Sequence, residues 1–381
     1  MLKTILPFLI IMPALVYNLL ALWCGHRYFR RERFLPVHTP PVTVIKPVKG
    51  MDAESFENFA SFCRQNYPIF RVIFAVADKN DPALPVIRRV MAAFPDSDID
   101  LVVDDRKHGP NYKVCNLMNA FSLAKHDIII VCDSDIRVGP EYLRHVCAPF
   151  ADPAVGLVTS LYRCSRVHGW ATALESLGFT AEMAPNVMVA RTLEGLSFAL
   201  GASMAVRREA LEAIGGFGAL VEYLADDYQL GNKVHRAGWR LELSDYMVES
   251  VMKEETFREV VIRQLRWCRT MRVSRPGGYA GSGITQPFPQ AFLAILVSGF
   301  TPPGVAAALL LYLIRGTVAT VFSRRYLGDR LLPKWLFLLP FRDLIGFTTW
   351  LLSFFGSRVS WRGRHYRVLS GGGMVELEKK G

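Results

Sequence analysis

The chain has 381 residues, of which 51% are hydrophobic, and it carries a formal net charge of +11. Its length allows one large or two ordinary domains. So apolar and basic a composition favours a membrane protein with a cationic cytosolic face and argues against a nucleic-acid-binding protein. The seven cysteines are scattered and form no CxxC pair, which excludes a disulfide framework and a zinc site.

The first apolar segment, residues 5–23, is interrupted only by Asn18 and is about as long as a membrane-spanning helix requires. The basic stretch 26–33 follows it, and no small-residue cleavage site comes after. We therefore predict that residues 1–25 form a transmembrane signal anchor with its N-terminus outside, followed by a linker at 36–41. The basic flank should lie in the cytosol.

Residues 42–285 alternate predicted strands with predicted helices. Apolar runs predict strands at 42–45, 72–77, 101–103 and 128–131, and helical spacing predicts helices at 55–65, 85–94 and 116–124. This alternation indicates an α/β domain with a parallel sheet and right-handed crossovers. Charged side chains lie at or after the strand ends: Lys46, Asp78, Asp104, Asp105 and Asp133. These loops should line one edge of the sheet and form a single site.

The strand at 128–131 ends in Asp133-Ser134-Asp135. Two carboxylates two positions apart, at the carboxyl end of a buried strand, suit Mg²⁺ or Mn²⁺ bound against a diphosphate. The alternative interpretation is a pair of solvated loop acids.

A second acidic pair, Asp226-Asp227, follows the glycine-rich segment 215–218. An aspartate here caps the N-terminus of a helix by accepting from free backbone N–H groups. Alternatively, it is the general base that sugar transfer with inversion needs to remove the proton of the acceptor hydroxyl.

Residues 263–267 read Arg-Gln-Leu-Arg-Trp and fit the pattern (Q/R)xxRW. Arginines three positions apart share a helix face, guanidinium groups pair bidentately with phosphate, and Trp267 offers a flat surface on which a sugar can stack. A basic amphipathic helix lying on the membrane has the same composition, and the two interpretations are compatible.

The C-terminal part, residues 286–381, is again membrane-like. Apolar segments at 291–300 and 305–321 flank the turn Pro302-Pro303-Gly304 and predict a hairpin of two membrane segments, the first one short. Residues 335–355 contain Arg342 and Asp343, which are costly at the bilayer centre. We predict an interfacial or re-entrant helix there, followed by a basic cytosolic tail. The alternative is one span within 289–314 and another at 335–355.

Together these motifs, in this order and framed by membrane segments, resemble the ceramide glucosyltransferase family, family 21 of the glycosyltransferases and a relative of the large inverting family 2. Further stretches that resemble it are Lys46-Pro47, Lys49-Gly50, Asp81-Pro82-Ala83, Asn116-Leu117-Met118, residues 132–138, residues 225–228 and Ser360-Trp361-Arg362. The DSD and ADDY forms look more like the bacterial branch, which includes hopanoid-biosynthesis glycosyltransferases.

The resemblance implies a GT-A (Rossmann-like) fold at 42–285 and an inverting enzyme in a bacterial inner membrane, with its catalytic domain in the cytosol. It would transfer one sugar, glucose or N-acetylglucosamine, from a UDP-sugar to a hydroxyl of a membrane lipid, either of ceramide type or a hopanoid polyol. Asp133 and Asp135 would bind Mn²⁺ or Mg²⁺, and Asp227 would be the catalytic base. The residues expected to bind the nucleotide sugar are Lys46, Asp78, Asp81, Lys113, Asp133, Arg263, Arg266 and Trp267. Either Asp78 or Asp81 would contact uracil.

Two other functions fit parts of the pattern. A processive polysaccharide synthase shares the acidic motifs and the RW motif, but such enzymes normally need several spans to form a sugar channel, and the spans here are few and short. A non-enzymatic membrane protein that binds lipid on an inactive transferase fold would not need the full set of acids and arginines.

Overall fold

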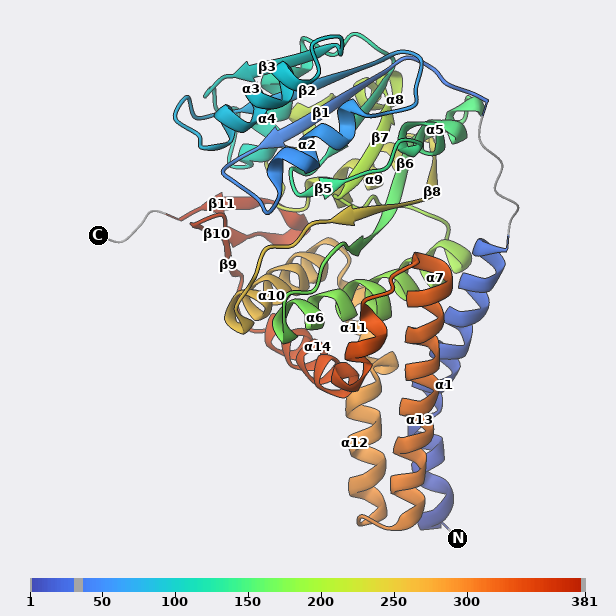
Figure 1. Cartoon of the computed structure of the whole chain (residues 1–381). Coiled ribbons are helices and arrows are strands. Elements are labelled where there is room, and N and C mark those ends of the chain that lie inside the picture. The colour runs from blue at the N-terminus through green and yellow to red at the C-terminus, as the bar shows by residue number, and fades with distance from the viewer. Residues whose placement is uncertain (1, 31–36, 378–381) are drawn as a thin grey trace.

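The computed structural model describes residues 2–30 and 37–377. An α/β domain sits on one end of a stalk formed by the helices α1, α12 and α13 (Figure 1). Four parts of the sequence predictions lie outside the described residues: residue 1 of the signal anchor, residues 31–33 of the basic flank, residue 36 of the linker and residues 378–381 of the tail.

The described part of the α/β domain contains one eight-stranded mixed sheet in the order β3-β2-β1-β4-β7-β6-β8-β5. Its strands are β1 (Val42–Val48), β2 (Phe70–Val76), β3 (Ile99–Val103), β4 (Ile128–Cys132), β5 (Ile136–Arg137), β6 (Val155–Cys164), β7 (Ser203–Arg207) and β8 (Arg240–Ser250). The first four in the order run parallel, as predicted, but β7 runs antiparallel to β4 and β6, and β5 antiparallel to β8. The expectation of a parallel sheet therefore holds only for its first half. The second half differs because the chain leaves β6 toward the stalk and returns from that side as β7.

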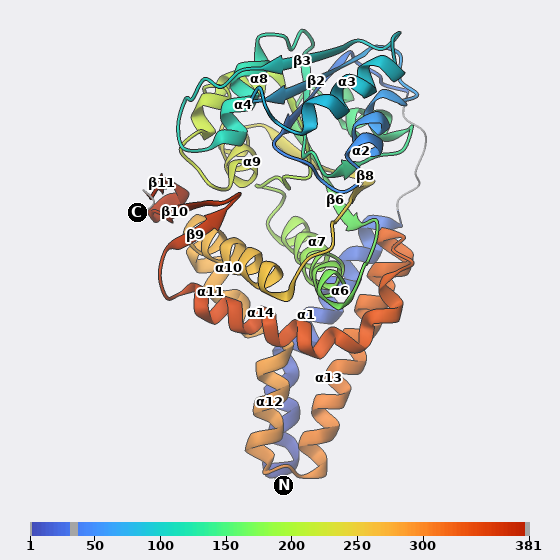
Figure 2. The ribbon, with the colours of Figure 1, turned by 60° about the vertical axis from the view of Figure 1, so that its left-hand side comes forward.

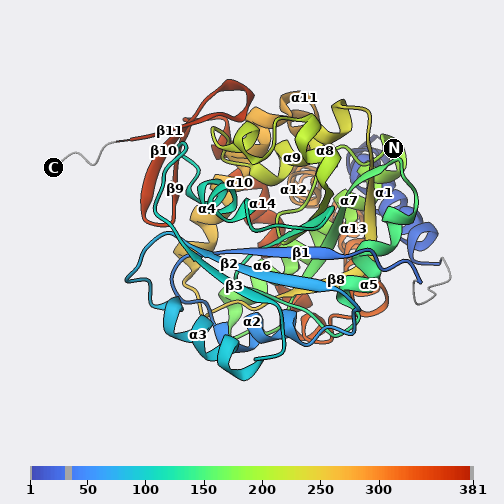
Figure 3. The ribbon, with the colours of Figure 1, turned by 90° about the horizontal axis from the view of Figure 1, so that it is seen from above.

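Helices cover both faces of the parallel half of the sheet. They are α2 (Ser55–Cys63), α3 (Ala83–Ala93) and α4 (Tyr112–Phe121), and the domain also contains α5 (Tyr142–Cys147), α8 (Arg208–Ala213) and α9 (Asp226–Arg236). Phe59 and Ile87 of α2 and α3 share one core cluster with Val44, whereas Leu117 of α4 shares another with Ile45. Figure 3 shows α2 and α3 together on one side of β1, β2 and β3. The alternating side chains of β1 thus separate two hydrophobic layers.

The strand order creates a switch point beside β4. The chain passes outward from β1 to β2 and β3 and then returns to β4 on the other side of β1. In open α/β sheets, ligands bind outside the carboxyl ends of the strands at such a point. Asp133 is the first residue after β4, so the sheet places the predicted DSD motif there.

The stalk consists of α1 (Leu2–Phe29), α12 (Pro287–Ser298) and α13 (Pro302–Val321) (Figure 1). Its packing core is rich in small side chains, including Ala14, Ala294 and Ala307, which let apolar helices approach closely. Among the described residues, three helical segments are long and apolar enough to cross a membrane, Thr4–Phe29, Pro302–Leu327 and Leu332–Ser353, while α12 is shorter.

The third of these segments does not join the stalk. Its helix α14 (Leu339–Ser353) lies across the end of the stalk nearest the α/β domain (Figure 2). Arg342 and Asp343 are buried there. Asp343 pairs with Arg315 of α13 at 2.9 Å, and Arg342 pairs with Glu182 at 2.6 Å. Arg342 and Asp343, whose charges argued against a membrane-spanning helix, thus form ion pairs that join α14 to neighbouring helices.

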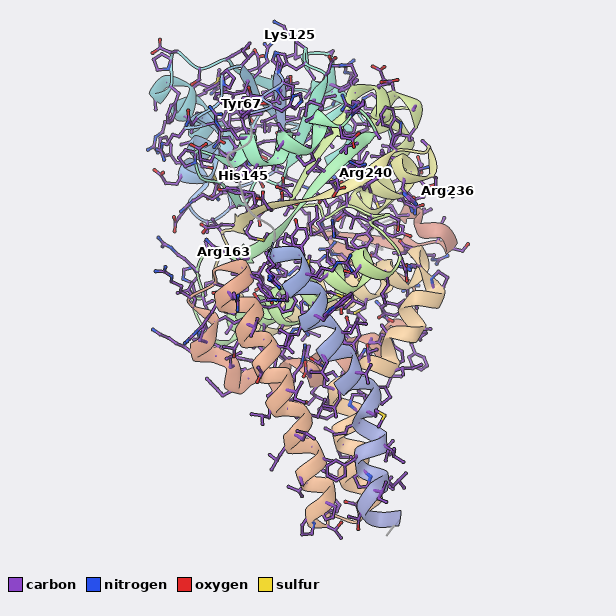
Figure 4. All side chains as sticks on the ribbon, turned by 90° about the vertical axis from the view of Figure 1, so that its right-hand side faces the viewer. Tyr67, Lys125, His145, Arg163, Arg236 and Arg240 are labelled. Carbon is purple, nitrogen blue, oxygen red and sulfur yellow. The ribbon has the colours of Figure 1, made fainter. Side chains whose placement is uncertain are left out.

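Further helices lie between the sheet and the stalk. They are α6 (Trp170–Leu177), α7 (Ala184–Leu193), α10 (Phe257–Ser274) and α11 (Pro276–Ser282), with a π-helical segment (Gly178–Met183) joining α6 to α7. Arg163, at the end of β6, lies where the α/β domain meets the helices below it (Figure 4). It donates a hydrogen bond to the Leu327 carbonyl at 2.5 Å and pairs with Glu249. The sheet is thereby tied directly to the end of the α13 segment.

The basic C-terminal segment, predicted as a tail, is folded. Strands β9 (Arg358–Trp361), β10 (Arg364–Val368) and β11 (Met374–Glu376) form a small antiparallel sheet beside α10 (Figure 1). It is anchored by Arg269 of α10, which donates to the Phe355 carbonyl at 3.0 Å and to the Arg358 carbonyl. The small sheet therefore belongs to the body of the molecule.

The Arg315–Asp343 pair should be important for stability. Replacing one partner, Asp343→Asn, leaves the Arg315 guanidinium buried without its counter-charge, which typically costs about 3–5 kcal/mol. We expect a clearly lower thermal unfolding temperature for the detergent-solubilised variant. The double variant Arg315→Met, Asp343→Leu should recover most of the loss. Equal destabilisation of the single and double variants would show that the charge pairing is not what stabilises this contact.

Candidate active site

Three backbone and side-chain contacts hold the loop that carries the DSD motif. Lys46, in the middle of β1, is fully buried and donates from Nζ to the Asp133 carbonyl at 2.9 Å. Burial lowers the pKa of Lys46 to about 8 even though Asp135 and Asp133 are near. On the other side of the loop, the Val251 N–H donates to the Asp135 carbonyl at 2.9 Å, and the Ser134 hydroxyl donates to Asp52. The loop is thus fixed before any ligand binds.

Lys113 joins the two acidic motifs. Its ammonium lies 2.8 Å from Oδ1 of Asp133 and 3.3 Å from Oδ2 of Asp226. Burial disfavours the charged amine, but Asp133 and Asp226 outweigh it and raise the pKa of Lys113. The side chain stands in the first turn of α4, whose N-terminus is capped by the Asn111 side chain accepting from the Val114 N–H at 3.1 Å. One largely buried cation therefore sets the spacing between β4 and α9.

The two aspartates at the start of α9 differ in their surroundings. Asp226 is buried and paired with Lys113. Asp227 is partly exposed, accepts only from the adjacent Tyr228 N–H at 2.7 Å, and has no ion pair within the described residues. Burial, followed by the charge of Asp226, raises the pKa of Asp227 to about 6. Gly201 leaves room for this carboxylate, since a Cβ there would lie 2.9 Å from Asp227 Oδ2.

The DSD carboxylates fit a divalent cation that takes its other ligands from substrate and water. Asp135 Oδ2 accepts from the Ser250 hydroxyl at 2.9 Å. Burial and the charges of Asp133 and Asp52 raise the pKa of Asp135 to about 6, and a bound cation would relieve this repulsion. Among the described residues, no group of three or more His, Cys, Asp or Glu side chains could hold an ion. One or two carboxylates plus phosphate oxygens is the usual Mg²⁺ site in nucleotide-dependent enzymes.

The RxxRW motif lies on α10, and its two arginines have different surroundings. Arg263 pairs with Glu175 of α6 at 2.9 Å and with Glu255, and these acids raise the pKa of its guanidinium. Arg266 has no ion pair within the described chain, and burial, then the charge of Arg263, lowers its pKa to about 10. Trp267 packs near Phe179, with ring centroids 6.1 Å apart. Of the two arginines, Arg266 is the one left to bind an anionic ligand.

The remaining predicted residues lie at the loops after β1 and β2. Asp81 is buried and accepts from the Gly50 N–H and the Ala83 N–H, both at 2.8 Å, so it fastens one loop to the other. Asp78 is exposed and accepts from the Asn80 N–H within its own turn.

Of the strand-end acids, Asp104 is separate from this cluster. Its carboxylate pairs with Arg106 at 2.6 Å beyond the outermost strand, β3.

The structure therefore brings together Lys46, Lys113, Asp133, Asp135, Asp226 and Asp227. The sequence analysis did not identify Glu175 and Glu255, which hold Arg263, or Asn111, which caps α4 and donates to the Tyr223 carbonyl at 2.8 Å. An Asn at the start of a helical pattern is a recognisable capping signal, whereas Glu175 lies 88 positions from Arg263 and has no local signal.

Comparison with known proteins agrees with this architecture. The sequence profile described as "Glycosyl transferase family 21" matches residues 6–374. Ceramide glucosyltransferase 1 of Caenorhabditis elegans is 27% identical over 208 residues, 54% of this chain and 44% of that protein. Ceramide glucosyltransferase of Candida albicans is 37% identical over 117 residues, 27% and 21% of the two chains. The matches thus span less than half of either relative's length.

Among solved structures, a mannosyltransferase from Pyrobaculum calidifontis in complex with GDP-Man and Mn²⁺ matches with a TM-score of 0.56. The match covers 93% of this chain and 99% of that one at 19% identity, and it confirms the GT-A fold. With the family profile spanning nearly its whole length, the chain belongs to glycosyl transferase family 21.

Proposed function

We propose that this protein is a membrane-bound inverting glycosyltransferase that transfers one glucose-type sugar, glucose or N-acetylglucosamine, from a UDP-sugar to a hydroxyl of a membrane lipid. The observation that carries the proposal is the arrangement around Lys113. It places a partly exposed carboxylate without an ion pair, Asp227, beside the fixed DSD loop at the switch point of the sheet. The lipid acceptor is of ceramide type or a hopanoid polyol, and the catalytic domain faces the cytosol.

In the proposed mechanism, Asp227 removes the proton from the acceptor hydroxyl. The hydroxyl oxygen attacks the anomeric carbon from the face opposite the diphosphate, the bond from that carbon to the diphosphate breaks, and UDP leaves, giving a β-glycoside. A general base with a pKa near the working pH is the most effective, and that of Asp227 is raised to about 6. Asp226 stays paired with Lys113 and keeps this pKa high.

Fixed positive charge assists the departure of the diphosphate. Arg266 on α10 supplies this positive charge. Arg263 positions α10 against α6 through its ion pair with Glu175. Mn²⁺ or Mg²⁺ held by Asp133 and Asp135 would neutralise charge on the leaving group. Preorganised cations in a site shielded from water stabilise developing negative charge strongly. Asp78, exposed after β2, is suited to contact uracil, while Lys46 and Asp81 keep the surrounding loops in place.

An aromatic row below the site supports a lipid acceptor. Trp170 of α6 stacks on Phe257 of α10 at 5.2 Å between ring centroids, and Phe257 stacks on Phe341 of α14 at 5.9 Å. Trp170 is 49% exposed and Phe341 40%. Exposed aromatic rings are typical of the membrane interface, where the acceptor hydroxyl lies. The small number of long apolar helices in the described chain also favours transfer of one sugar over synthesis of a polymer.

The role of Asp227 can be tested with Asp227→Asn. The amide keeps the shape and can still accept from the Tyr228 N–H, but it cannot take a proton. We expect normal folding, near-normal UDP affinity by calorimetry, and a transfer rate about 10²–10⁴-fold lower. If the side chain only caps α9, Asn would serve nearly as well and activity would survive, which would contradict the proposal.

The raised pKa of Asp227 predicts a pH profile. Because the base must be unprotonated, kcat/KM should fall as the pH drops through about 6. Asp226→Asn removes the neighbouring charge that raises this pKa, so the acidic limb of the profile should move to lower pH. Asp52→Asn is the control, since Asp52 raises the pKa of Asp135 instead. If the acidic limb of the pH profile moved in Asp52→Asn and not in Asp226→Asn, the group that titrates would be a carboxylate of the DSD motif and not Asp227.

Metal dependence follows from the DSD motif. Treatment with EDTA should abolish transfer and weaken UDP binding, and adding Mn²⁺ or Mg²⁺ should restore both. Asp135→Ala should bind UDP weakly with or without added metal, because a ligand is lost, whereas Ser134→Ala should retain most of its response. A metal-free preparation with full activity would rule out the metal role.

A further inference from the structure

The small C-terminal sheet touches the two segments that position the acidic cluster. The Met374 N–H donates to the Glu222 carbonyl at 2.8 Å, four residues before Asp226. Arg364 donates to the Tyr112 hydroxyl at 2.9 Å and pairs with Glu376 at 2.5 Å. Tyr112 directly precedes Lys113. The small sheet is therefore packed against both α4 and the approach to α9.

The turn between β9 and β10 reaches the loop after β1. Arg362 and Gly363 form the turn, with φ of 48° and 79°, the left-handed region that a glycine adopts freely and an arginine rarely does. In this conformation, Arg362 donates from Nη1 to the Lys49 carbonyl at 2.9 Å. Gly50, the next residue, is bonded to Asp81. The turn thus ends at the loops where the nucleotide is expected.

The residue before the turn lies close to α10. The Arg266 guanidinium carbon is 6.0 Å from the centroid of the Trp361 ring, within the range of a cation–π contact. Arg266 is also close enough to Asp227 that this carboxylate counters part of the fall in its pKa. Trp361 and Arg362 therefore connect the nucleotide end of the site with its catalytic end.

Three cations lie along this strip, and nearby acids offset their charges only in part. Within the described chain, Lys49, Arg266 and Arg362 have no ion pair. Burial, then the charges of Arg364 and Arg362, lowers the pKa of Lys49. Like charges held together are unfavourable, and a dense anion bound between them would offset this cost. A diphosphate has the charge and the oxygen acceptors that arginine binds best.

We propose that the β9–β10 hairpin forms a wall of the donor site and that Arg362 binds the diphosphate of the nucleotide sugar. The inference rests on the proposed function, because it assumes a nucleotide-sugar donor. In the absence of ligand, the bond to the Lys49 carbonyl holds the guanidinium near its working position. Trp361 is a positioning residue that holds Arg266 beside it.

Calorimetric titration of the full-length detergent-solubilised protein with UDP and Mn²⁺ tests this. Arg362→Gln should weaken UDP binding about tenfold or more, since it removes a charge-assisted contact to phosphate. The backbone strain is unchanged because both residues carry a Cβ. Arg362→Lys should recover part of the affinity. Arg367→Gln is the matched control, because Arg367 is an exposed arginine of the same hairpin with no side-chain partner in the described chain.

Thermal unfolding without ligand should be the same for the wild type and all three variants. UDP affinity of Arg362→Gln within twofold of wild type, or an equal loss in Arg367→Gln, would overturn the inference while leaving the proposed function standing. A wild-type protein that binds no UDP would refute the proposed function and this inference together.

Discussion

The ion pairs of Lys113 are the constraint on which the site depends. A buried ammonium is stable only when its charge is compensated, and here the compensation comes from Asp133 after β4 and Asp226 at the start of α9. Loss of either acid would leave the amine buried with half of its partners. The two acidic motifs therefore have a fixed separation, and within the described residues Asp227 is the aspartate of its pair that is left without an ion pair.

A second set of contacts places this cluster relative to the membrane helices. Arg263 ties α10 to α6, Arg163 ties β6 to the end of the α13 segment, and Arg315 ties α13 to α14. The first two contacts join residues 88 and 164 positions apart, and the third joins residues 28 positions apart. These contacts join the sheet, the helices α6, α10 and α14 and the stalk, so the acidic cluster and the apolar helices of the stalk are held in one framework.

Much of this arrangement could be predicted, and the failures have physical reasons. The strands of the parallel half were predicted within a few residues because each is rich in the apolar residues typical of strands, and β4 is a continuous buried apolar run. The helix α4 begins four residues before its predicted start because Asn111 caps it. The strands β9 and β10 were missed because they are short and carry Arg358, Arg364 and Arg367, which favoured a basic tail. Arg362-Gly363 between them is nevertheless a turn signal. Glu175, one of the two partners of Arg263, lies 88 positions away along the chain, so the sequence analysis had no basis for separating the surroundings of Arg263 from those of Arg266.

The flat position of α14 across the stalk has a consequence for the product. Because α14 is locked to α13 by the Arg315–Asp343 pair, the proposed reaction would have its carboxylate, Asp227, at a constant height over the bilayer. An acceptor whose hydroxyl emerges at that height can react. Once it carries a sugar, its outermost hydroxyls lie further from the membrane and past the carboxylate. In the proposed function, a rigid support of this kind would end the reaction after a single addition, without any need to recognise the finished glycolipid.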